Sequence, residues 1–302
     1  MKRPDLMPTL PRLGLCILLL LSVVAFRAVG AQRAVGAQRG AISEVPVPEG
    51  YVLAWHDEFD RDGRPDPTIW GFEQGFQRNR ELQWYQDDNA WVEGGRLIIE
   101  ARREDLPNPT YKQGSDDWKQ SRPRIEFTSS SLRTMGKKQW QFGRLEVRAK
   151  VIAVTGLWPA IWTLGSARSW PGCGEVDVME YYDDKIWANA CWLGRRRGQS
   201  VWDSSATPVS ELGDAETWDE TFHVWRMDWD EREIKLYVDD RLLNTIDLTQ
   251  TVNGRGGDNP FHEPHYLLLN LAIGGDKGGD PSGTDFPSRY EIDYVRVYQK
   301  KS

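Results

Sequence analysis

The sequence predicts an all-β domain, arranged as a sandwich or a barrel of short strands. Helical patterns are scarce along its 302 residues. Short runs in which apolar and polar residues alternate recur instead, as expected of strands with one buried face. Glycine, proline, asparagine and aspartate separate these runs and mark turns. Many short strands at this spacing are typical of a β-sandwich or barrel.

The clearest strand is Gly143–Lys150, in which Leu145, Val147 and Ala149 share one face and charged residues occupy the other. The apolar run 265–271 predicts a strand buried on both faces. Further alternating strands are expected at 96–102, 221–229, 233–238 and 293–298. Polar segments with turn residues or little pattern predict loops at 104–124, 195–217, 254–260 and 274–288.

The N-terminus has the pattern of a secretory signal peptide. Lys2 and Arg3 precede the apolar run 13–26, which is shorter than the ~20 residues of a membrane-spanning helix. Cleavage after Ala31 or after Ala37 fits, because the segment 27–32 repeats at once as 33–38. We therefore expect a signal peptide with a short linker at 1–37, an extension at 38–50 and one domain at 51–300. The protein is expected to be secreted or periplasmic, with no membrane attachment after cleavage.

The amino-acid composition limits the kinds of molecule that the protein is expected to bind. The formal net charge of −7 argues against a nucleic-acid binder. Fifteen tryptophans are enough both to fill a core and to stack on flat ligands such as sugar rings. Only Cys173 and Cys191 follow the signal peptide, and we expect two buried thiols, with a disulfide as the alternative.

Three carboxylates lie within six residues, at Glu175, Asp177 and Glu180. Alternation along a strand places Glu175 and Asp177 on one face and Glu180 on the other. A β-bulge at Val178–Met179 would return Glu180 to the face of the other two. Like charges that close raise the pKa of at least one acid, which suits acid–base chemistry on a glycosidic bond. The alternatives are a solvated acidic strand and a calcium site.

The run 174–180 resembles the signature of glycoside hydrolase family 16, in the bulged form typical of laminarinase-like endo-β-glucanases. The resemblance extends from Tyr51 to Gln299 through segments in the expected order. These are 55–60, 79–85, 127–134, 142–150, 156–162, 269–275 and 293–298. The resemblance implies a concanavalin A-like β-jelly-roll sandwich of two antiparallel sheets with a concave glycan cleft.

The resemblance also implies roles for individual residues in a monomeric hydrolase that cuts within a polysaccharide and retains anomeric configuration. Glu175 would be the nucleophile, Glu180 the general acid and then base, and Asp177 the residue that assists them. Trp158, Trp162 and Trp170 would line the cleft, with core packing as the alternative. Sugar hydroxyls would be bound by Asn79, Arg80 and Glu81, which could otherwise form a polar loop. The amide of Asn270 would either hold a neighbouring backbone group or face the cleft.

Many members of the family carry one structural calcium ion, and no catalytic cofactor is implied. The positions that match its ligands are Glu58, the carbonyl of Gly95 and Asp293, and oxygen ligands of this kind suit calcium. The alternative is that these acids are simply solvated.

One departure from the family pattern concerns the substrate. Laminarinases often have a histidine on the strand after the acids, where this sequence has Asn189 and Cys191. His262 and His265 are candidates to replace it. A β-1,3-glucan is the first expectation for the substrate, and a marine galactan such as agar, porphyran or carrageenan is the second, since Arg195–Arg197 could pair with sulfate or carboxylate groups. A non-catalytic glucan-recognition protein is the alternative from another class.

Overall fold

A computed structural model describes residues 45–196, 198–214, 217–254 and 256–301. The expected signal peptide, its linker, most of the extension and Arg197 therefore lie outside the described residues. Within that part of the chain, no helix is long and apolar enough to cross a membrane.

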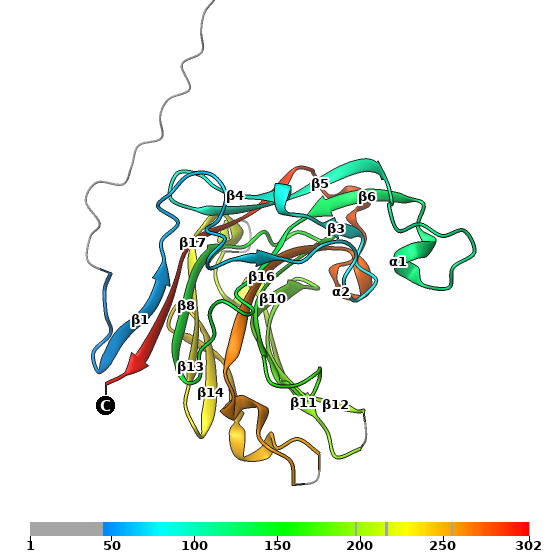
Figure 1. The fold of residues 1–302 in the computed structure, drawn as a ribbon. Coiled ribbons are helices and arrows are strands. Elements are labelled where there is room, and N and C mark those ends of the chain that lie inside the picture. Colours follow the sequence, from blue (N-terminus) through cyan, green and yellow to red (C-terminus); the bar gives the residue numbers. More distant parts are fainter. Residues whose placement is uncertain (1–44, 197, 215–216, 255, 302) are drawn as a thin grey trace, which may run out of the picture. The chain divides into compact units, whose positions relative to one another are not determined.

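Two β-sheets face each other (Figure 1). The ten-stranded sheet has the order β15-β14-β13-β8-β17-β5-β6-β3, with β1 paired to β17 and β4 paired to β5. Its strands are β1 (Tyr51–Asp57), β3 (Gln83–Tyr85), β4 (Ala90–Val92), β5 (Leu97–Pro107), β6 (Arg124–Ser129), β8 (Gly143–Lys150), β13 (His223–Trp229), β14 (Glu233–Val238), β15 (Arg241–Asp247) and β17 (Ser288–Lys300). Its strand pairs are antiparallel apart from β3 with β6, which are parallel.

The seven-stranded sheet has the order β12-β11-β10-β9-β16-β7-β2. Its strands are β2 (Gly71–Phe72), β7 (Ser131–Arg133), β9 (Leu157–Gly165), β10 (Glu175–Tyr182), β11 (Lys185–Leu193), β12 (Ser200–Pro208) and β16 (His265–Ile273). Helical structure is confined to short turns: α1 (Trp118–Ser121), α2 (Gly275–Gly278), η1 (Asp87–Asn89), η2 (Val209–Glu211), η3 (Trp218–Glu220), η4 (Leu248–Gln250), η5 (Pro260–His262) and η6 (Pro281–Gly283).

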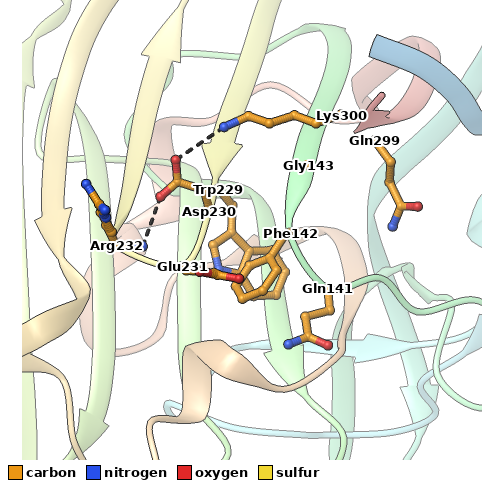
Figure 2. Close-up of a pocket in the computed structure, with 9 residues that line it drawn as sticks. All are labelled: Gln141, Phe142, Gly143, Trp229, Asp230, Glu231, Arg232, Gln299 and Lys300. Carbon is orange, nitrogen blue, oxygen red and sulfur yellow. Dashed lines mark hydrogen bonds and ion pairs between the residues drawn. The ribbon is translucent and has the colours of Figure 1, made fainter. Parts of the chain in front are cut away.

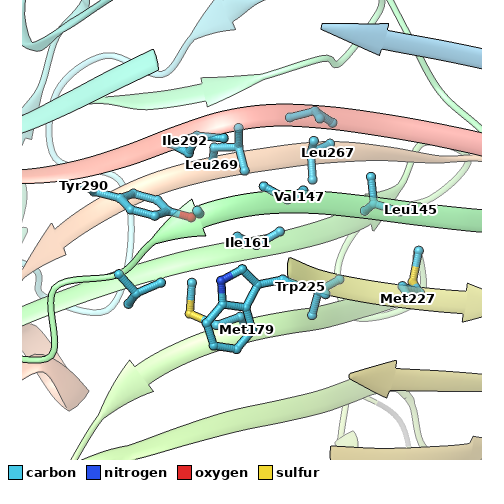
Figure 3. Close-up of a cluster of buried hydrophobic side chains, with 14 of the residues drawn as sticks. Leu145, Val147, Ile161, Met179, Trp225, Met227, Leu267, Leu269, Tyr290 and Ile292 are labelled. Atoms are coloured by element: carbon cyan, nitrogen blue, oxygen red, sulfur yellow. The ribbon is translucent and has the colours of Figure 1, made fainter. Parts of the chain in front are cut away.

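The main core lies between the two sheets (Figure 3). Leu145 and Val147 of β8 and Trp225 of β13 meet Ile161 of β9 and Met179 of β10, and all five are buried. Residues of β9, β10 and β11 that alternate with these core positions point away from the ten-stranded sheet. The acids of β10 therefore belong to the outer face of the seven-stranded sheet.

Several strands match the expectation from alternation. The predicted bounds of β8 and β14 agree with the structure residue for residue, and β16 is buried along its whole length as predicted. One expected loop was wrong, because 195–217 contains β12. This strand lies at the edge of its sheet, and its outer residues Trp202, Ser204 and Ala206 are exposed, so no apolar face appears in the sequence. The expected loop 104–124 also begins within β5 and includes α1.

Candidate active site

The predicted bulge in β10 is confirmed. The register with β9 shifts between Asp177 and Met179, and the register with β11 shifts between Asp177 and Glu180. Val178 and Met179 are consecutive, yet both are fully buried in the core. Because two successive side chains point inward, Glu180 returns to the face that carries Glu175 and Asp177.

Each acid accepts a hydrogen bond from a neighbouring indole or amide. Trp170 Nε1 donates to Glu175 Oε2 at 2.7 Å, and Trp158 Nε1 donates to Glu180 Oε1 at 2.9 Å. The amide of Asn189, on β11, donates to Asp177 Oδ2 at 3.3 Å and to Glu180 Oε2 at 3.1 Å. The bulge and these donors hold the three carboxyl groups in one row on the outer face.

Burial dominates the electrostatics of this row. It raises the pKa of Glu180 to about 7, helped by the charge of Glu175 and opposed by the donors Trp158 and Asn189. Burial, followed by the charges of Glu180 and Glu175, raises the pKa of Asp177 well above its usual value. Burial also raises the pKa of Glu175, against the hydrogen bond from Trp170. The three acids therefore share at least one proton near neutral pH.

The hydrogen bonds of Asp177 influence where that proton lies. They lower the pKa of both Glu175 and Glu180, and the bond to Glu175 raises the pKa of Asp177. A positive charge on Arg78 lowers the pKa of Glu175 as well. These interactions favour an ionised Glu175 beside a protonated Asp177, which is the state that a nucleophilic carboxylate requires.

The three tryptophans predicted to line the cleft differ in exposure. Trp170 is 53% exposed, whereas Trp158 and Trp162 are each 8% exposed. Neither of the two belongs to the main core. Trp158 packs with Tyr182 in one small cluster on the outer face, and Trp162 lies in another. Trp162 thus lies opposite Asp177 on β9, Trp158 bonds to Glu180, and the open indole of Trp170 bonds to Glu175.

Asn270 lies on the face that carries the acids, because it alternates with the core residues Leu269 and Leu271, and its amide bonds to side chains and not to a backbone group. Its Oδ1 accepts from Trp162 Nε1 at 2.7 Å, and its Nδ2 donates to Tyr85 Oη at 3.1 Å. The guanidinium of Arg78 lies 5.1 Å from the centre of the Trp162 ring. Asn270 therefore fixes the orientation of Trp162, and Tyr85 and Arg78 are members of this network that sequence reasoning missed.

The loop residues Asn79, Arg80 and Glu81 divide into an exposed pair and a buried acid. The side chains of Asn79 and Arg80 are exposed, and both residues have positive φ. The carboxylate of Glu81 is buried and accepts from Asn79 at 3.2 Å and from Gln83 at 2.7 Å. The buried Glu81 thus holds the loop through its hydrogen bonds, and the exposed side chains of Asn79 and Arg80 are accessible to a ligand.

The residues expected to bind calcium do not fit that ion as they are arranged. Both carboxylates face arginine, Glu58 with two bonds to Arg296 at 2.9 and 2.8 Å and Asp293 with one to Arg148 at 2.6 Å. Across the described residues, no three His, Cys, Asp or Glu side chains gather in a way that could hold a metal ion. A guanidinium supplies the positive charge that these acids need.

Neither histidine replaces the one that is missing beside the acids. His265 is buried against Thr163 and the carbonyl of Pro260, and burial lowers its pKa to about 4. His262 bonds to the carbonyl of Glu231. Cys173 and Cys191 are free and buried, as expected. The residue that takes the place beside the acids is Asn189, which the sequence shows at the position of the missing histidine and which pairs opposite Asp177 in the structure.

A separate pocket of about 540 Å³ lies beside the turn between β13 and β14 (Figure 2). Phe142 and Trp229 line it, and so do Lys300 and Asp230, which bond to each other at 3.3 Å. None of the three acids lines it. Its volume therefore has no bearing on the chemistry of the β10 row.

A two-sheet sandwich with a row of acids on one outer face suits a glycoside hydrolase, and comparison with known proteins gives the family. Residues 78–296 match the model of glycosyl hydrolases family 16. The chain belongs to glycoside hydrolase family 16, whose members are endo-acting, retaining hydrolases on a β-jelly-roll fold.

Relatives within the family act on different glycans. A β-glucanase of Rhodothermus marinus is 36% identical over 274 residues, which is 82% of this chain and 85% of the relative. The laminarinase catalytic domain of Thermotoga maritima is 35% identical with a TM-score of 0.69, covering 84% of this chain and all of that one. A structure from work on endo-acting O-glycanases of the human gut microbiota that initiate mucin breakdown is 37% identical, with a TM-score of 0.76 and coverage of 84% and 93%.

Proposed function

We propose that the protein is a secreted hydrolase that cleaves a β-1,3-glucan of the laminarin type. The observation that carries the chemistry is the row of three acids on the bulged strand, with a pKa near 7 at Glu180. Similarity to a β-glucanase and to a laminarinase supports a β-glucan as the substrate.

Glu175 acts as the nucleophile in the first step. Its carboxylate attacks the anomeric carbon while Glu180 gives its proton to the glycosidic oxygen, and the bond to the leaving sugar breaks. The product is a glycosyl-enzyme ester at Glu175. The proton shared with Asp177 keeps Glu175 ionised before attack.

Glu180 acts as a base in the second step. It takes a proton from water, which attacks the anomeric carbon from the opposite side, and Glu175 leaves as a carboxylate. Two inversions give net retention. A pKa near 7 suits both roles, because the group is then readily protonated and readily ionised at neutral pH.

A marine galactan is the second candidate substrate. Laminarinases often have a histidine where this chain has Asn189 and Cys191, so contacts to the sugar next to the cleaved bond differ. Arg195 and Arg196 are exposed on the loop after β11 and could pair with sulfate. We also propose export of the protein, for which N-terminal sequencing of the exported chain should give a start at Gln32 or Gln38.

A substrate panel tests the proposal. Laminarin, mixed-linkage β-glucan, agarose, porphyran, carrageenan and mucin are incubated with the protein, and new reducing ends are counted. The highest rate is expected on laminarin, with the first product in the β configuration by NMR. Cleavage of a galactan alone would replace the β-glucan with the second candidate, and binding of glucan without cleavage would identify a recognition protein.

A further inference from the structure

Two tryptophans stand out by exposure in the part of the chain that the structure describes. Trp170 is 53% exposed and Trp202 is 45% exposed, whereas the other described tryptophans are less open. Trp170 is accounted for by its hydrogen bond to Glu175. Trp202 lies on the edge strand β12 and has no role in the site described above.

The register of the sheet aligns Trp202 with the nucleophile. Glu175 pairs with Cys191 on β11, and Cys191 pairs with Trp202 on β12. Side chains of directly opposite residues project to the same face of a sheet. The indole of Trp202 therefore lies on the face that carries the acids, two strands away from Glu175.

The neighbouring row of residues gives the same orientation independently. Asp177 pairs with Asn189, and Asn189 pairs with Ser204. Asn189 bonds to Asp177 on the acid face, so Ser204 lies on that face too. Ser204 is exposed and is two residues from Trp202, which by alternation shares its face.

The indole of Trp202 has no partner within the described chain. It makes no ring contact and its Nε1 donates no hydrogen bond there. A flat apolar ring with a free N–H at one edge matches the chemistry of a pyranose, which presents a C–H face and hydroxyl groups around it. Exposed aromatic area of this kind, on the same face of a sheet as an active site, is typical of a binding surface.

We propose that Trp202 forms a sugar-binding subsite of its own, at the β12 end of the cleft. Two strand spacings separate it from Glu175 by about 10 Å, which exceeds the length of one pyranose ring. Trp202 therefore stacks on a sugar beyond the two that flank the cleaved bond, and Ser204 offers a hydroxyl beside it. The inference rests on the proposed glycan hydrolysis and adds how far the bound chain extends.

Kinetics on oligosaccharides of increasing length test this subsite. The probes are cut from whichever polysaccharide of the panel the wild-type protein degrades, with laminari-oligosaccharides as the first choice. The variants are Trp202→Ala and Trp202→Phe. The control is Val52→Ala, which shortens a residue 46% exposed on β1 of the other sheet. Circular dichroism and melting temperature establish that all variants fold.

Trp202→Ala is expected to raise KM for long oligosaccharides by roughly 3- to 10-fold, the size of an aromatic stacking contribution. The kcat should stay unchanged, because contact with a remote sugar is equal in the ground and transition states. Short oligosaccharides that end next to the cleaved bond should show no change, and Trp202→Phe should retain most of the affinity.

Failure of the proposed subsite can be distinguished from failure of the proposed function. Equal KM values for wild type and Trp202→Ala at every length would overturn the subsite while leaving the hydrolase intact. Equal losses at every length would also overturn it, because they would mean that Trp202 acts on the structure of the site. If the wild type cleaves nothing in the panel, binding of labelled glycans to the same variants decides between the outcomes, and it is the proposed function that fails.

Discussion

Glu180 must be protonated when the glycosidic bond breaks and ionised when water attacks. Its surroundings meet both needs, since burial and the charge of Glu175 raise its pKa while two hydrogen-bond donors limit the rise. Glu175 also bonds to Asp177, as Glu180 does, and the positive charge of Arg78 lowers its pKa in addition. Two chemically identical side chains thus differ in pKa through their neighbours.

The two glutamates should respond differently to the leaving group. Glu175→Gln and Glu180→Gln should each lower hydrolysis of the polysaccharide on the order of 10³-fold or more. With an aryl glycoside whose phenolate departs without a proton, Glu180→Gln should recover a burst of released phenol, whereas Glu175→Gln should not. Recovery by both variants, or by neither, would contradict the roles assigned.

Asn189 is a positioning residue whose effect should appear in the pH profile. Its amide donates to Asp177 and Glu180, and its Oδ1 is buried without a partner in the described chain, so the side chain serves the acids more than the fold. Loss of the donor removes an interaction that favours the ionised form of Glu180, and the pKa of Glu180 should rise.

In wild type, kcat/KM is expected to fall as pH rises through about 7, where Glu180 loses its proton. Asn189→Ala should move this basic limb to higher pH and lower the maximum rate. Thr245→Ala, at an exposed position on β15 of the other sheet, serves as the control for the pH profile and should leave the limb in place. A basic limb unchanged in Asn189→Ala would show that the amide has no influence on the acid.

At the scale of single elements, the bulge in β10 joins catalysis to stability. It turns Met179 into the core at the point where it returns Glu180 to the acid face. Met179→Ala should lower the free energy of unfolding by about 2–5 kcal/mol through lost burial and a cavity. Urea unfolding measures the loss, and the exposed Val52→Ala should change it by less than about 0.5 kcal/mol. A loss that small for Met179→Ala would mean that the bulge does not anchor in the core.

The sequence predicts β-strands correctly where one face of the strand is buried and the other is exposed to solvent. β8 and β14 alternate cleanly and were located to the residue, and the parity error at Glu180 was enough to predict the bulge. β12 was missed because an edge strand with an exposed outer face shows no apolar alternation. With β12 unseen, neither the place of Trp202 beside the acids nor the pairing of Asn189 between two strands could be derived.

Ion pairs between residues far apart in the sequence could not be predicted from the sequence either. Glu58 pairs with Arg296, 238 positions away, and Asp293 pairs with Arg148, 145 positions away. Both acids were expected to bind calcium because they match the positions of its ligands in the family, and each has an arginine as a cationic partner in the structure. The family and the acids follow from a local motif, whereas the partners of each acid follow from the pairing of the whole sheet.

At the scale of the whole molecule, the acids should reduce stability at the pH where they are ionised. The pKa of Glu180 in the folded protein is about 7, above its ordinary value of 4.5. The folded state therefore binds protons more tightly than the unfolded state between these values. The stabilising contribution of Glu180 is fully present below pH 4.5 and is lost as pH rises through 7. His265 acts in the opposite direction, since its pKa is lowered to about 4 and its contribution is lost as pH falls from about 6.5.

Glu180→Gln keeps the shape of the side chain and removes its charge, so it isolates this contribution. The variant should melt higher than wild type at pH 8, by roughly 2–10 °C for a gain on the order of 1–3 kcal/mol. At pH 4, where Glu180 is protonated in the folded protein and mostly protonated in the unfolded chain, the difference should nearly vanish. The contribution of His265 is common to both proteins and cancels in the comparison. Val52→Ala, which removes no charge, should differ from wild type by the same amount at both pH values. A Glu180→Gln variant that melts lower than wild type at pH 8 would mean that the hydrogen bonds to the Glu180 carboxylate outweigh the cost of burying its charge. The fold alone would then not raise the pKa of Glu180, and bound substrate would have to do so.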